Sequence, residues 1–152
     1  MLYGLALLAG IVAGSRTFTA PAAVSWAARL GALNLNGSWL AFMGYAWTPW
    51  IFTLLAVVEM VTDQLPSTPS RKVPMQFGAR IVSGALCGAT IGASGAVIGG
   101  LVAGVIGAVI GTLGGAAARA RLAQAFGKDL PAALIEDAVA IGGAALIVAS
   151  FA

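Results

Sequence analysis

Four acidic side chains lie in stretches of sequence that are otherwise apolar, and they are the residues best placed to do chemistry. Glu59 and Asp63 are four positions apart, so they share one face of a helix. Glu136 and Asp137 are adjacent and lie near the start of the last apolar stretch. A charged residue inside a membrane-spanning helix costs at least about 2.5–3.5 kcal/mol, so each of these residues is a candidate for binding an ion or a substrate.

Arg16 is the basic counterpart of these residues. It lies inside the first apolar stretch, between Ser15 and Thr17, and Pro21 follows shortly afterwards. This polar patch interrupts a predicted helix, and helices broken at membrane depth form substrate sites in transporters. The alternative is a structural salt bridge between Arg16 and Glu59, and the residues alone leave both interpretations open.

The acidic residues also have a structural explanation. The helix dipole favours acidic residues at helix N-termini, which alone would account for the adjacent pair in the last stretch. Asp63 could pair with Arg80 at the membrane interface. Neither explanation covers Glu59, which lies deeper, in the C-terminal half of its predicted helix. A functional carboxylate cluster and structural ion pairs with Arg16 or Arg80 therefore remain equally open.

The residue types restrict the chemistry. The chain has no histidine and one cysteine, which excludes imidazole bases and Ser-His-Asp or Cys-His arrangements. We expect no enzymatic activity and no cofactor; an aspartyl dyad of Asp63 and Asp137 is conceivable but has no other support. If a metal binds, the candidate ligands Glu59, Asp63, Glu136 and Asp137 favour Mg²⁺, Ca²⁺, Mn²⁺, Na⁺ or H⁺ over zinc or copper. Because clustered carboxylates repel one another, at least one should hold a proton or share a cation.

Composition predicts an all-α integral membrane protein. Of the residues, 60% are hydrophobic and 9% are charged, whereas a soluble domain has about 25% charged residues. No charged side chain occurs from Ile81 to Ala118. As one helix this stretch would extend about 57 Å, nearly twice the bilayer core of about 30 Å. We therefore expect two transmembrane passes here, joined by a turn near Ser94 and Gly95.

The whole chain, residues 1–152, is predicted to form one transmembrane domain with five helical spans. Trp39, Trp47 and Trp50 follow the first span closely and indicate an aromatic belt at one membrane face. Loops rich in proline, glycine or basic residues separate the spans. The predicted spans are residues 2–33 (broken near 14–21), 49–65, 78–93, 97–118 and 132–151.

The basic residues concentrate on one side of this arrangement. With five spans, the 66–77 and 119–131 loops share the side of the N-terminus, and only Arg29 lies on the other side. The positive-inside rule then predicts a multi-pass protein of the bacterial inner membrane, with a cytoplasmic N-terminus and an external C-terminus. Short basic loops suit an anionic bilayer surface and not nucleic acid. The residues on the basic side are Arg71, Lys72, Arg80, Arg119, Arg121 and Lys128.

Glycines recur at four-residue spacing in the central stretches. Such stripes let helix backbones approach closely, within one chain or across a homo-oligomer. Because the chain is short and its loops are thin, we expect a homo-oligomer. A glycine-lined pore is the alternative. The glycines expected to pack helices are Gly84, Gly88, Gly92, Gly100, Gly104, Gly107 and Gly111.

Three elements of the sequence carry a resemblance to a known family. They are Gly14-Ser15-Arg16-Thr17-Phe18 with the apolar stretch up to Gly31, the segment from Val58 to Pro66, and Ile135-Glu136-Asp137-Ala138. In this order, over nearly the whole chain, they resemble the uncharacterised bacterial membrane family called domain of unknown function 4126. The resemblance implies an integral membrane fold and no particular activity. It marks Arg16, Glu59, Asp63, Glu136 and Asp137 as the positions that carry the pattern.

Two functions follow as hypotheses. The first is a small transporter or channel for a cation or small solute, with the carboxylates as the ion or proton site. The second is a non-transporting structural module, or one that interacts with lipid, in which Arg16 and the basic loops contact anionic head groups. A cavity around Glu59 would favour the first. Carboxylates fully paired with arginines would favour the second.

Overall fold

The computed structural model describes residues 1–65, 70 and 72–152, and this part of the chain is helical without any strand. The all-α prediction is therefore confirmed. Two short 3-10 helices, η1 (Trp39–Gly44) and η2 (Gly92–Ser94), lie in the connections. The α-helices are α1 (Leu2–Ser15), α2 (Thr19–Arg29), α3 (Thr48–Thr62), α4 (Pro74–Ile91), α5 (Val97–Phe126) and α6 (Asp129–Ala149).

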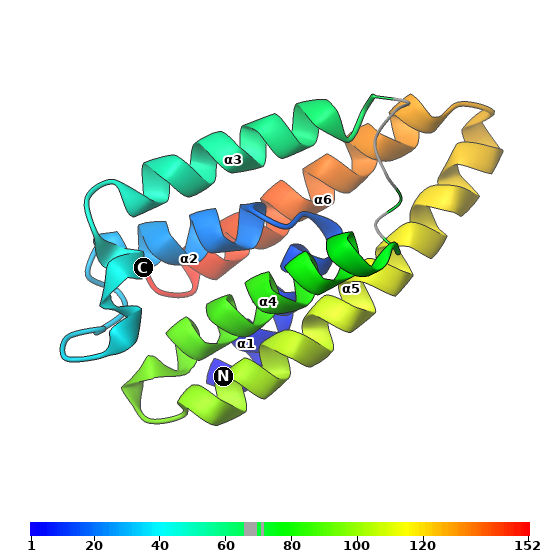
Figure 1. The fold of residues 1–152 in the computed structure, drawn as a ribbon. Coiled ribbons are helices and arrows are strands. Elements are labelled where there is room, and N and C mark those ends of the chain that lie inside the picture. Colours follow the sequence, from blue (N-terminus) through cyan, green and yellow to red (C-terminus); the bar gives the residue numbers. More distant parts are fainter. Residues whose placement is uncertain (66–69, 71) are drawn as a thin grey trace.

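Helices α3 to α6 each run along the length of the molecule between two ends (Figure 1). At one end, Leu2, residues 32–34, the turn around η2 and Phe151 line a common pocket, and we call it the terminal end. At the other, Arg119 contacts both Asp63 and Asp129 where α3 ends and α6 begins. We call this the basic end, because Lys72 and Lys128 belong to it.

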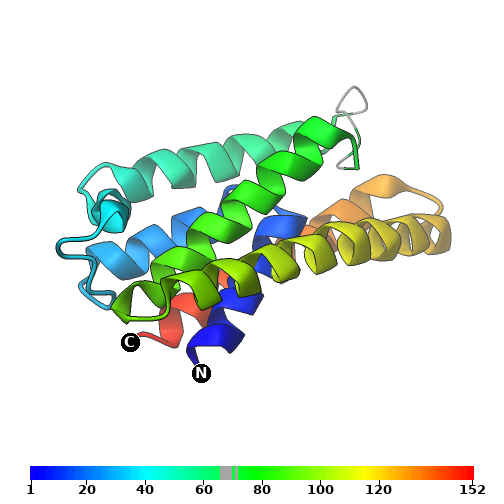
Figure 2. The same ribbon diagram turned by 60° about the horizontal axis from the view of Figure 1, so that its bottom comes forward.

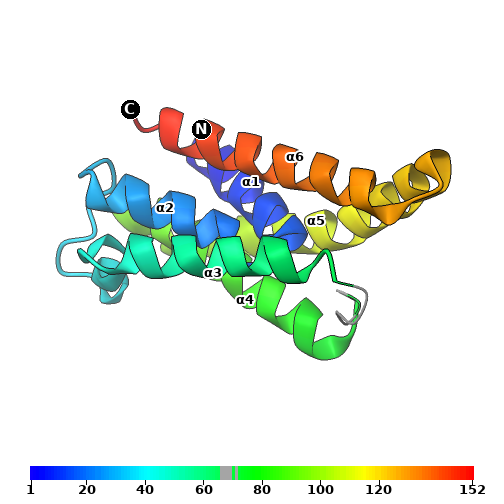
Figure 3. The ribbon, with the colours of Figure 1, turned by 90° about the horizontal axis from the view of Figure 1, so that it is seen from above.

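The first two helices form a hairpin whose tip lies beside the end of α3 and short of the end of α5 (Figure 3). Helix α1 runs parallel to α5: Tyr3 lies beside Gly99, and Ile11 beside Gly111. Helix α2 then returns antiparallel to α3. Residues 2–33 were expected to form one interrupted span, and this expectation is wrong. The chain reverses at the extended residue Arg16, so α1 and α2 do not follow one another along a single line.

The reversal also places the two chain termini together. Leu2 and Phe151 line the same pocket at the terminal end, and both termini lie at this end in two views (Figures 1 and 2). The sequence predicted an N-terminus on the side of the basic loops, opposite the C-terminus. In the structure both termini lie at the terminal end, because α2 returns the chain to the end at which α1 begins.

The boundaries of α5 are partly as expected. A turn separates it from α4, Gly95 takes a φ of 128° that suits glycine, and the helix begins at Val97. It continues to Phe126, past the predicted end at residue 118, because residues 119–126 contain neither glycine nor proline. Gly127 then ends the helix in the left-handed conformation.

Two helices of the described residues, α5 and α6, are long and apolar enough to cross a membrane; α1 and α3 are apolar but shorter. Large apolar side chains are also exposed on the outside of the bundle, which is costly in water. These features indicate membrane association, while the number of spans stays a prediction. Examples of the exposed side chains are Val61, Val82, Ile98, Val139 and Leu146.

The glycine stripes lie where α4, α5 and α1 pack together. Gly84 on α4 faces Gly104 on α5, and a Cβ at Gly84 would lie 2.6 Å from the carbonyl oxygen of Gly104. On its other side α5 packs Gly107 and Gly111 against the backbone of α1. Gly88 and Gly100 face each other, and Gly92 contacts the start of α5. These contacts are made within one chain.

We predict that Gly104→Ala lowers the melting temperature of the protein in detergent, measured by circular dichroism. The new Cβ would meet the backbone of Gly84 and Gly88, and overpacking of this kind costs about 1–3 kcal/mol. Gly114→Ala, in the same helix, is the control because nothing lies within 4 Å of its Cβ position. An unchanged melting temperature in Gly104→Ala would contradict the packing described above.

Candidate functional site

The break between α1 and α2 exposes backbone groups in the interior, and side chains from neighbouring helices bind them. Arg80 of α4, which is buried, donates from Nη1 to the carbonyl oxygens of Gly14 at 3.1 Å and Ser15 at 2.7 Å. The hydroxyl of Thr112 on α5 also donates to Gly14, at 3.2 Å. A cation thus lies at the C-terminus of α1, where the helix dipole is negative.

A carboxylate occupies the opposite position, at the N-terminus of α2. Glu59 accepts hydrogen bonds from the backbone N–H of Thr17 at 2.7 Å and of Phe18 at 3.0 Å. The hydroxyl of Ser83 donates to the carbonyl oxygen of Thr17 at 2.5 Å. Nη2 of Arg80 lies 3.6 Å from Oε1 of Glu59, so one ion pair joins the two half-helix ends.

Arg16 lies at the tip of the hairpin with no exposed surface and contacts three carboxylates. Its Nη1 pairs with Oδ2 of Asp63 at the end of α3. Its Nη2 lies 2.5 Å from Oδ1 of Asp137 and 3.8 Å from Oε2 of Glu136, both on α6. Gln64 approaches Asp137 from the other side, at 3.5 Å. Arg16 therefore joins the hairpin to α3 and α6.

Arg119 extends this network toward the basic end. Its Nη1 lies 3.4 Å from Glu136, and its Nη2 donates to the backbone oxygen of Asp63 at 3.2 Å and to Asp129 at 2.5 Å. The sequence prediction placed Arg119 in a loop and did not include it in the site. Helix formers on both sides of Arg119 were the only signal that α5 continues through it.

The predicted site residues come together, but with partners other than those expected. The sequence left open a pair of Arg16 with Glu59 and a pair of Asp63 with Arg80. In the described part of the chain Arg16 pairs with Asp63 instead, and Arg80 pairs with Glu59. The physical reason is the reversal at the hairpin tip, which presents the backbone of residues 17 and 18, and not Arg16, to Glu59.

The carboxylates were also candidate metal ligands. Among the described residues, no group of three or more acidic or cysteine side chains is placed to hold a metal ion. Each of the four candidates contacts a guanidinium instead. The hard-cation ligand set stays a prediction.

Carboxylates outnumber guanidiniums in the network. All five acidic residues of the chain belong to it. Against them stand three arginines of the described part: Arg16, Arg80 and Arg119. These counts cover the described residues, and Arg80, Asp129 and Glu136 make further contacts besides these pairs. Of the carboxylates, Asp129 is the exposed one.

Scans against protein-family models, curated proteins and solved structures found no match to this chain. The resemblance to the domain of unknown function 4126 therefore stays a prediction.

We predict that Arg16→Met destabilises the protein by about 3–5 kcal/mol, because it leaves Asp63 and Asp137 buried without their cation. Thermal unfolding in detergent measures the change. Arg121→Met is the control, since Arg121 lies exposed on α5 and outside the network. Equal stability of the two variants would show that the pairs of Arg16 contribute nothing to folding.

Proposed function

We propose that this protein is a small multi-pass transport protein that moves a cation or small solute across a bacterial inner membrane. The gathering of three carboxylates around the one guanidinium of Arg16 at the hairpin tip is the observation that carries the proposal. Carboxylates so close together repel one another, which favours the binding of a further cation among them. A protein that binds and releases this cation at the tip has the central element of a transport cycle.

The position of the hairpin tip supports the proposal. The tip lies beside Thr112, the sixteenth of the 30 residues of α5, and beside Asp63 at the end of α3. Backbone breaks inside a membrane are tolerated where they face protein or a water-filled path, and half-helix ends there bind substrates and coupling ions. Here the two half-helix ends already hold one cation and one anion.

The pairs of Arg16 suggest how binding is coupled to movement. Arg16 belongs to the hairpin, while Asp63 and Asp137 belong to α3 and α6. A cation that binds either carboxylate competes with Arg16 for it and lowers the free energy of separating the hairpin from its neighbours. The buried Nε–H of Arg16 also has no hydrogen-bond acceptor among the described residues, so a solute or water at the tip would gain a donor.

The orientation that we propose has four crossing helices, α3 to α6, and a hairpin that enters from outside. The basic end, with Lys72 and Lys128, then faces the cytoplasm under the positive-inside rule. Both termini and Arg29 face outward. This orientation keeps both basic loops in the cytoplasm and the C-terminus outside, as the sequence predicts, and differs from that prediction only in the side of the N-terminus. We retain membership of the domain of unknown function 4126 and a homo-oligomeric state as parts of the proposal.

A non-transporting structural module is the second candidate. The observation that favours it is that each of the four buried carboxylates contacts an arginine. In this case the network serves only to hold the hairpin in the membrane. The two candidates differ in whether a cation crosses the bilayer.

For the topology, we predict that an impermeant thiol reagent labels Tyr3→Cys and Ser150→Cys in intact cells, in a Cys87→Ser background. Both positions lie at the terminal end and Tyr3 is 58% exposed. Lys72→Cys and Lys128→Cys should react only after the membrane is opened. Labelling of Tyr3→Cys only from the cytoplasm would overturn the hairpin orientation, and outside labelling at both lysine positions would overturn the assignment of the basic end.

For the transport site, we predict that Glu59→Gln and Asp137→Asn abolish ion-dependent flux in proteoliposomes. Each change removes a charge and keeps the shape of the side chain, and because each leaves a buried arginine without one carboxylate, circular dichroism of the purified variants must show that they are folded. A pH-sensitive dye inside the vesicles, with Na⁺, K⁺ or Mg²⁺ outside, measures the flux, and Arg121→Gln is the control.

Unchanged flux in both variants would remove the carboxylates from the mechanism. If wild-type vesicles conduct none of these ions, the structural module is the better account.

A further inference from the structure

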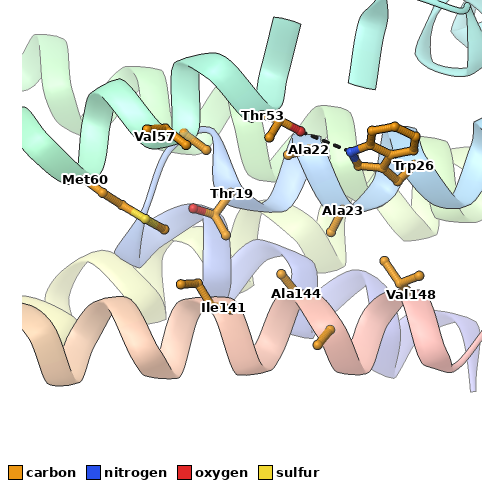
Figure 4. A pocket seen from close by; sticks show the side chains of 12 residues that line it. Thr19, Ala22, Ala23, Trp26, Thr53, Val57, Met60, Ile141, Ala144 and Val148 are labelled. Atoms are coloured by element: carbon orange, nitrogen blue, oxygen red, sulfur yellow. Dashed lines mark hydrogen bonds between the residues drawn. The ribbon is translucent and has the colours of Figure 1, made fainter. Parts of the chain in front are cut away.

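A groove with apolar walls runs along α2 on the side opposite α1. Helices α3 and α6 both pack on α2 and leave between them a cavity of about 380 Å³, within the range of about 300–1,000 Å³ that is typical of ligand sites. Figure 4 shows side chains of all three helices facing into it. We call it the apolar groove. Its walls are mostly alanine, valine, isoleucine and methionine, which suit hydrocarbon.

The groove has two unlike ends. Thr19, Met60 and Ile141 lie at the deep end, next to the hairpin tip (Figure 4). Trp26 lies at the other end, where its indole N–H donates to the hydroxyl of Thr53 at 3.1 Å. From Thr19 to Trp26 the helix rises about 10 Å, so the groove extends from the hairpin tip toward the terminal end.

A second pocket adjoins the groove at Trp26. It measures about 260 Å³ and is lined by Trp26, Arg29, Ala46, Trp47 and Trp50. We call it the Arg29 pocket. Arg29 is exposed and makes no ion pair with any described residue, while tryptophans of this kind favour the level of lipid head groups. The Arg29 pocket and the apolar groove therefore share Trp26, and a cation lies beside indole rings where the two meet.

We propose that the apolar groove and the Arg29 pocket together bind one anionic phospholipid of the surrounding bilayer. The phosphate lies at the guanidinium of Arg29, and one acyl chain follows α2 between α3 and α6. Opposite charge favours the head group, and apolar walls favour the chain. The site is separate from the ion-pair network and requires only that the bundle lie in a membrane, whether or not it transports an ion.

The hydroxyl of Thr19 provides a test that distinguishes an acyl chain from a ligand with a polar group at the deep end. It is buried at the deep end of the groove and has no hydrogen-bond partner among the described residues. A hydrocarbon chain makes no use of a hydroxyl, so Thr19→Val should leave lipid binding unchanged. A ligand with a polar group at its deep end would instead need this hydroxyl.

Native mass spectrometry of the detergent-purified protein, titrated with dioleoyl phosphatidylglycerol or dioleoyl phosphatidylcholine, tests the site. Arg29→Gln should weaken binding of phosphatidylglycerol by about fivefold, and should weaken binding of phosphatidylcholine less, because its choline cation offsets the charge of its phosphate. The control is Arg121→Gln, which changes an exposed arginine far from the groove. Ala144→Leu, which fills the groove, should reduce binding of both lipids, whereas Ala149→Leu on the same helix should not.

Two results would overturn the proposal. Equal binding of phosphatidylglycerol by Arg29→Gln and the wild type would show that Arg29 does not hold the head group. Loss of binding in Thr19→Val would show that the occupant is polar at its deep end and not an acyl chain. Because Arg29 is exposed, Arg29→Gln remains a valid test even if Ala144→Leu fails to fold.

Discussion

A broken backbone in an apolar interior needs hydrogen-bond partners, and much of this structure follows from that requirement. Where α1 ends and α2 begins, the carbonyl groups of Gly14 and Ser15 and the N–H groups of residues 17 and 18 have no partner within their own helices. Each unsatisfied group would cost several kcal/mol in hydrocarbon. Arg80 and Glu59 satisfy both sets and neutralise each other, which explains why two buried charges occur on α4 and α3 at this level.

Glycine packing brings these partners within reach. A guanidinium on α4 can bind the end of α1 only if the helix axes lie close, and the stripes at the contacts of α5 with α4 and α1 allow that approach. Gly14 itself lies so near the backbone of α5 that the hydroxyl of Thr112 reaches its carbonyl oxygen. Substitutions at the stripe therefore bear on the ion-pair network as well as on stability.

Parts of this arrangement could be predicted from the sequence. Gly95 shows where the turn between α4 and α5 lies, and the polar patch around Arg16 shows that the first helix breaks. The direction of the chain after the break could not be predicted, because a helix that crosses and one that returns have the same composition. The ion pairs could not be predicted from the sequence either. They depend on the relative heights of separate helices, and the continuation of α5 through Arg119 was needed to place the third guanidinium.

The charge balance of the network bears on whether it is only structural. A network that served only to hold the hairpin would gain most from equal numbers of cations and anions, since each unpaired buried charge adds a desolvation cost. Among the described residues, five carboxylates against three guanidiniums depart from this balance, and Asp63, Glu136 and Asp137 share one fully buried arginine. Arg119, at 3.4 Å from Glu136, shares in holding these carboxylates. Because Arg16 contacts both α3 and α6 through them, a cation that competes with Arg16 for Asp63 or Asp137 would also weaken the packing of the hairpin against both helices.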